Sequence, residues 1–133
     1  MPTRLDGSGL MVVTLVEEIT KLADQAAAPL APVHEREVAD PRPGWQRRAS
    51  GSGRKSLEDR HKREVRRYRT DELRSGLAVM AATYRDAFVA GRASRPDAAT
   101  HAVRRIHDAL EALERNPNEP LLLQHLLLEL PSL

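Results

Sequence analysis

Apolar residues along the chain recur at steps of three and four, the spacing that places side chains on one face of an α-helix. The first such stripe consists of Val12, Val16, Ile19, Ala23 and Ala26. A second stripe consists of Leu73, Leu77, Met80, Tyr84 and Phe88, and a third of Ala99, Val103, Ile106, Leu110 and Leu113. No segment alternates apolar and polar residues with period two, as a half-buried strand would. The pattern therefore predicts an all-α fold.

Breaks in these stripes predict where the helices begin and end. Residues 1–9 are expected to be a linker, residues 10–28 the first helix, and residues 29–55 a flexible linker, because proline and glycine gather there. Residues 56–133 are expected to hold the remaining helices, with an N-cap at Ser56 and a C-terminal stop at Gly91 for the longest of them. The prediction is a small bundle of about four helices, with a disordered Pro/Gly-rich linker after the first helix.

The last predicted helix, over residues 121–130, is apolar on most of its sides. Only Gln124, His125 and Glu129 interrupt its leucines. A helix that is apolar almost all round is buried almost all round, either at the centre of its own bundle or against a neighbouring chain, and the pattern favours the two equally. The candidate partner interface comprises Leu110, Leu113, Leu122, Leu123, Leu126, Leu127 and Leu130.

Positive charge is concentrated in one stretch, although the formal net charge is only +2. Residues 47–69 hold ten lysines and arginines but only three acids. The candidates for non-specific contact with nucleic-acid phosphates are Arg60, Lys62, Arg63, Arg66, Arg67 and Arg69. A run of charge is more often a solvated helix face or a surface for an acidic partner. DNA binding is therefore the second interpretation, and it is expected to be weak.

Residue patterns typical of catalysis or metal binding are missing from the sequence. It has no cysteine, its five histidines never stand four residues apart, and it contains neither His-Glu-x-x-His nor Gly-x-Ser-x-Gly. The apolar run over residues 10–16 is too short to span a membrane and lacks a signal-peptide pattern. We expect no catalytic site, no metal, no cofactor, no small-molecule ligand, no membrane contact and a cytoplasmic location.

Two segments resemble a known family. Residues 57–87 read LEDRHKREVRRYRTDELRSGLAVMAATYRDA, and residues 106–130 read IHDALEALERNPNEPLLLQHLLLEL. With the opening LDGSGLMVVTLVEEITKLADQAA, this ordered set resembles the C-terminal (collar) domain of the delta-prime subunit of the bacterial DNA polymerase III clamp loader, in its high-GC Gram-positive form. The resemblance covers nearly the whole chain apart from the linker around residues 30–54.

The resemblance implies a function in DNA replication. In that family the C-terminal helical domains of five subunits form a ring that holds the clamp loader together, while the AAA+ modules bind ATP. The chain is then an oligomerisation domain whose partners are the delta and tau/gamma subunits, with no catalytic site of its own although the parent complex is a DNA-directed DNA polymerase. The family's ATPase-like domain and zinc-binding cysteines are missing from these 133 residues, so one domain of a longer protein is expected. The alternatives are a nucleic-acid-binding protein that uses its basic helix and a free-standing helical homo-oligomer.

Overall fold

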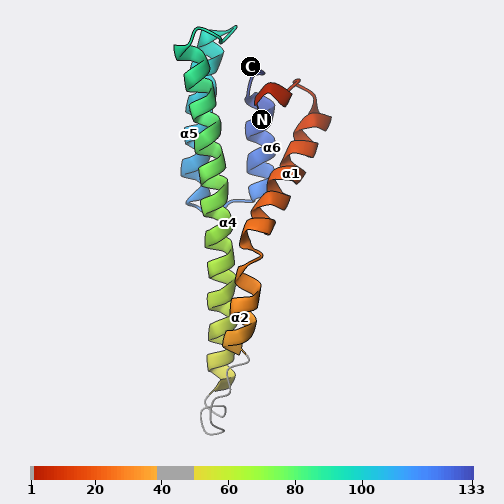
Figure 1. Ribbon diagram of the computed structural model, residues 1–133, viewed down its shortest axis with the longest axis vertical. Helices are drawn as coiled ribbons and strands as arrows, with labels where there is room; N and C mark the ends of the chain where they lie inside the picture. Colours follow the sequence, from red (N-terminus) through yellow and green to blue (C-terminus); the bar gives the residue numbers. More distant parts are fainter. Residues whose placement is uncertain (1, 39–49) are drawn as a thin grey trace. The chain divides into compact units, whose positions relative to one another are not determined.

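The computed structural model describes residues 2–38 and 50–133. These residues form a one-turn 3-10 helix, η1 (Pro2–Arg4), and five α-helices: α1 (Gly9–Ala27), α2 (Leu30–Val38), α4 (Ser50–Val89), α5 (Pro96–Leu113) and α6 (Glu119–Glu129), as Figure 1 shows. None of the described residues lies in a strand, which confirms the all-α prediction. Among the described helices, none combines the length and the apolar character needed to cross a membrane.

The chain divides into two compact units, which we call unit 1 and unit 2. Unit 1 consists of Met1–Lys21 and Leu73–Leu133, and unit 2 of Leu22–Glu72. Two helices contribute to both units. The first part of α1 and the second part of α4 belong to unit 1, and the remainder of each helix belongs to unit 2.

Unit 1 contains an apolar core to which all four of its α-helices contribute. Its largest fully buried side chains are Leu15 of α1, Tyr84 of α4, Ile106 of α5, and Leu123 and Leu127 of α6. Helices α5 and α6 pack against each other, and Figure 1 shows α5 running back antiparallel to α4. Members of all three predicted stripes and of the last predicted helix therefore contribute to this core.

Each stripe differs from its prediction by a few positions. On α4, Leu73, Leu77, Met80 and Tyr84 are buried as predicted, but Phe88 is exposed. Phe88 lies one residue before the end of the helix at Val89. Similar shifts of one residue occur at the edges of the other stripes, where Leu15, Ala27, Ala102 and Ala109 join the buried set.

The ends of α4 and α6 have the geometry that their residue types favour. Gly91 adopts φ +68°, its N–H donates to the carbonyl of Phe88, and the N–H of Arg92 donates to the carbonyl of Ala87. This pair of bonds is a Schellman motif, which confirms the predicted stop at Gly91. At the start of α6, the side chain of Asn118 accepts a hydrogen bond from the N–H of Leu121 at 3.1 Å, as an N-cap does.

The segment between the first helix and the long helix is shorter than predicted at both ends. Residues 30–38 form α2, and α4 begins at Ser50 rather than at Ser56. Pro32 does not prevent α2, because it stands third in the helix, where a backbone N–H has no carbonyl four residues back to bond. The remaining part of the predicted linker, residues 39–49, lies outside the described residues. The described chain thus has five α-helices rather than about four.

Candidate functional site

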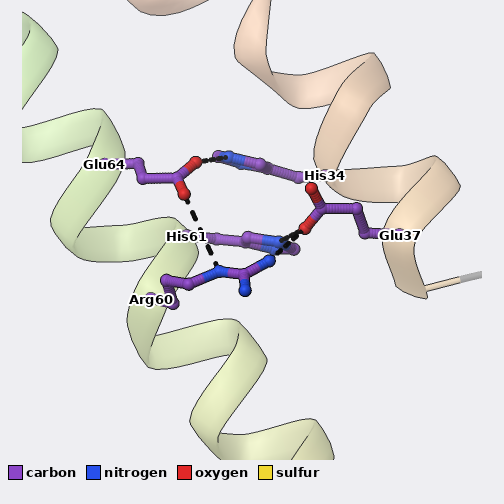
Figure 2. A network of polar contacts seen from close by, with 5 residues as sticks. All are labelled: His34, Glu37, Arg60, His61 and Glu64. Atoms are coloured by element: carbon purple, nitrogen blue, oxygen red, sulfur yellow. Dashed lines mark hydrogen bonds and ion pairs between the residues drawn. The ribbon is translucent and has the colours of Figure 1, made fainter.

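Five polar side chains meet where α2 faces α4 in unit 2. They are His34 and Glu37 of α2 and Arg60, His61 and Glu64 of α4, and we call them the polar cluster (Figure 2). Residues three or four apart share one face of a helix. The members of the cluster are therefore brought together by the helical conformation of the two segments.

The side chains of the polar cluster form a closed set of contacts. The imidazoles of His34 and His61 stack with ring centroids 3.8 Å apart and planes 5° from parallel. The Glu37 carboxylate lies 2.6 Å from Nε2 of His61 and 2.7 Å from Nη2 of Arg60. The Glu64 carboxylate lies 2.9 Å from Nε2 of His34 and 3.7 Å from Nε of Arg60. As Figure 2 shows, each imidazole is thus paired with a carboxylate from the other helix.

Burial makes these pairings matter for stability. His61 is only 7% exposed, and among the described residues it is the one polar side chain that is classed as buried. A buried polar group without a hydrogen-bond partner destabilises the fold, and Glu37 supplies that partner. The pKa of Glu37 lies below its ordinary value because His61, and after it Arg60, donate hydrogen bonds to the carboxylate. The polar cluster therefore holds α2 on α4.

Catalysis or metal binding does not follow from this geometry. In catalytic triads a carboxylate also orients an imidazole, but there the second ring nitrogen accepts the proton of a nucleophile. The hydrogen bonds of the polar cluster join only histidine, glutamate and arginine. Within residues 2–38 and 50–133, no group of three or more histidines and acids is placed to hold a metal ion. The arrangement joins two helices.

The polar cluster was not predicted from the sequence, because His34 and Glu37 fall within the expected linker over residues 29–55. A signal was present, however. The pattern His-x-Arg-Glu-Val occurs twice, at residues 34–38 and at residues 61–65. In the structure the histidine of each copy contacts the glutamate of the other copy, as two equivalent segments do when they pair antiparallel. A search for short internal repeats would have indicated that these two segments face each other.

The structure separates the six predicted nucleic-acid contacts into two groups. Arg60 belongs to the polar cluster, and Arg69 forms an ion pair with Asp24 at 3.1 Å. The other four are exposed and form no ion pair with any described residue: Lys62, Arg63, Arg66 and Arg67. Of the six predicted contacts, these four are available to a partner without breaking a contact of unit 2.

The predicted partner interface lies mostly inside unit 1. Five of its seven leucines are buried, namely Leu113, Leu123, Leu126, Leu127 and Leu130, while Leu110 and Leu122 are half-buried. The bundle therefore provides most of the neighbours that the leucine-rich helix needs. Two leucines of α6 outside the predicted interface remain uncovered, Leu121 at 61% exposed and Leu128 at 56% exposed.

The end of the chain is tied to the core of unit 1. The hydroxyl of Tyr84 donates a hydrogen bond to the carbonyl of Pro131, and burial raises the pKa of that hydroxyl. Arg105 of α5 forms an ion pair with Glu129 of α6 at 3.2 Å. These contacts fix the orientation of α6, and therefore the direction in which its exposed leucines point.

In comparisons with known proteins, no family model, no curated protein and no solved structure matches the chain. What the chain does is therefore inferred from its own residues. Three described features are available for that inference: the polar cluster of unit 2, the exposed cations on the first part of α4, and the exposed leucines of α6.

Proposed function

We propose that the chain is a helical assembly domain that joins other subunits through α6 of unit 1. The observation that carries the proposal is the position of Leu121 and Leu128, which are large, apolar and more than half exposed. They are seven residues apart, so at about 100° per residue they share one side of the helix. Burying a leucine side chain fully contributes about 1.5–3 kcal/mol, which favours a partner that covers this side.

The opposite side of α6 keeps the exposed leucines in place. Leu123, Leu126 and Leu127 are buried in the core, and on the helical wheel they lie about 140–240° from Leu121. Because the core side is packed, the outer side is presented in one orientation. A surface that is already ordered loses less conformational entropy on binding than a mobile one. An apolar helix face held in this way suits helix-on-helix association.

The resemblance of residues 57–87 and 106–130 to the delta-prime collar domain supplies the identity of the partners. On this proposal they are the delta and tau/gamma subunits of the DNA polymerase III clamp loader, and the process is DNA replication. The contribution of this chain is then to hold the complex together, through contacts between collar helices.

The test is association between purified proteins. Light scattering coupled to size-exclusion chromatography would be applied to the full chain alone and after mixing with the delta and tau/gamma subunits of its own organism. We expect a mixed complex that is lost in the Leu121→Asp/Leu128→Asp variant. The control is Val79→Asp, which places one aspartate at a position on α4 that is 68% exposed and should leave the complex intact. Leu126→Asp is unsuitable because Leu126 is buried and the change would unfold unit 1.

Two outcomes would contradict the proposal. The first is a stable homo-oligomer that does not take up the other subunits, which would instead support the free-standing oligomer. The second is equal loss of the complex in the α6 variant and in the Val79→Asp control, since the side of α6 would then have no special role. Circular dichroism of each variant would verify that its helices are intact.

A further inference from the structure

The unpaired cations of α4 lie on one side of the helix. At about 100° per residue, Lys62, Arg66, Arg63 and Arg67 span an arc of about 140°. Lys55, which is also exposed and unpaired among the described residues, lies within the same arc about two turns earlier. We call these five residues the basic face. Its centre is almost opposite His61, and so the basic face points away from α2.

The contacts within unit 2 explain why the basic face stays unpaired. Glu64 is occupied by His34 and Arg60, and Glu37 by His61 and Arg60. Glu58 lies 3.7 Å from Arg54, outside the arc. Asp59 is the one acid whose position on the helical wheel falls among the five cations. Glu37 and Glu64 are therefore used on the side where α2 packs, and the basic face keeps a net excess of positive charge, with five cations against Asp59.

We propose that the basic face binds the phosphate backbone of duplex nucleic acid without sequence preference. Its five cations extend over about 18 Å of helix axis, at a rise of about 1.5 Å per residue. Double-stranded DNA carries about one negative charge per 1.7 Å of its axis, so each cation can meet a phosphate along such a length. Three of the five are arginines, and one guanidinium group can donate two parallel hydrogen bonds to the oxygens of a phosphate.

Other polyanionic partners fit the basic face less well. A helix that lies on a membrane surface needs a large apolar side beside its cations, and between Lys55 and Arg67 no large apolar residue falls within this arc. Proteins that bind single strands stack the bases on aromatic side chains. Tyr68, the aromatic residue of this stretch, lies about 100° beyond the edge of the arc on the helical wheel. Contact with duplex phosphates requires only the charges that are present.

The test uses the full chain and a fluorescently labelled 20-base-pair DNA duplex, with binding followed by anisotropy over a range of salt concentrations. Four to five phosphate contacts predict that log K falls with log[salt] at a slope of about −4. Affinity should then fall on the order of a hundredfold between 50 and 200 mM salt. The Arg63→Gln/Arg66→Gln variant should reduce the size of that slope by about 2 and weaken binding at least about tenfold at the lower salt concentration.

The matched control removes the same charge elsewhere. Arg92 and Arg104 are exposed in unit 1, and Arg92→Gln/Arg104→Gln should leave both the slope and the affinity nearly unchanged. Equal loss in the two double variants would overturn the proposal, because binding would then follow net charge. Binding of equal strength to phosphatidylserine vesicles or to polyglutamate would also overturn it, since the partner would be a membrane or an acidic protein. Circular dichroism would verify that both variants remain helical.

Discussion

Unit 1 buries large side chains completely, among them Tyr84, Ile106 and Leu127. Among the described residues of unit 2, by contrast, only two alanines and His61 are buried. Unit 1 is therefore stabilised mainly by apolar area, at about 25 cal/mol per Å² removed from water. Unit 2 relies on hydrogen bonds and ion pairs, of which the bond to the buried His61 matters more than the exposed pairs. The same long helix, α4, takes part in both kinds of packing.

This difference follows from the side chains that α4 offers along its length. Its second part carries Leu73, Leu77 and Met80, which bury well without partners of a particular chemistry. Its first part carries few apolar residues, so α2 is held by groups that must match in charge and in hydrogen bonding. Unit 1 should accordingly respond to changes of shape, and unit 2 to changes of charge and pH.

The largest effect is expected from a cavity in unit 1. Leu127→Ala removes a side chain that is 1% exposed and should lower the free energy of unfolding by about 3 kcal/mol, measured by urea denaturation. The adjacent Leu128→Ala is the control, because Leu128 is mostly exposed and its truncation should cost less than about 1 kcal/mol. Similar costs for the two variants would show that α6 is not packed as described.

The core of unit 1 could largely be predicted from the sequence, because burial in a bundle follows the helical period. Leu73, Leu77, Met80 and Tyr84 were identified from spacing alone, and Gly91 from its position after the last apolar residue. Which leucines of the last helix stay exposed could not be predicted. A helix with leucine on nearly every side gives no periodic signal, and only the positions of its neighbours distinguish Leu127 from Leu128.

The polar cluster of unit 2 could not be predicted by the same reasoning. Proline and glycine gather in residues 29–55 and predict a linker there, so the sequence indicates no helix for the segment with His34 and Glu37. A pairing between polar residues 24 to 30 positions apart leaves no periodic trace in either segment. The repeated His-x-Arg-Glu-Val pattern is the sequence signal for this pairing. It indicates the pairing only if both copies are known to be helical.

An intermediate effect is expected from His61→Ala. The change removes the ring that stacks on His34 and bonds to Glu37, which should destabilise the packing of α2 by about 1–2 kcal/mol. NMR chemical shifts and amide exchange of α2 would report the loss, while those of α5 and α6 should change little. The control is His107→Ala, at an exposed histidine of α5. An unaltered α2 in the His61 variant would contradict the role given to the polar cluster.

The smallest effect is expected from the titration of Glu37. Its pKa in the folded chain is below the ordinary value, so its charged form stabilises unit 2 at neutral pH. That contribution should be lost as the pH falls through the ordinary carboxyl range, near about 4, and below it. NMR signals of α2 followed from pH 7 to pH 3 should reveal the change, and Glu37→Gln should reduce it.

Unit 1 provides the control for this titration. The pKa of Glu18 is also lowered, by its hydrogen bond from Arg4. Glu18→Gln should therefore alter the acid response of η1 and leave that of α2 as it is. A loss of the α2 response in the Glu18 variant would show that the effect assigned to Glu37 arises elsewhere.

Residue-resolved amide hydrogen exchange at neutral pH compares the two units most directly. If unit 1 is held by its apolar core and unit 2 by the polar cluster, the amides of α5, α6 and the second part of α4 should be protected at least about tenfold more strongly than those of α2. Protection in α2 equal to that in α6 would contradict this account, because the polar cluster would then hold its helices as firmly as the core does.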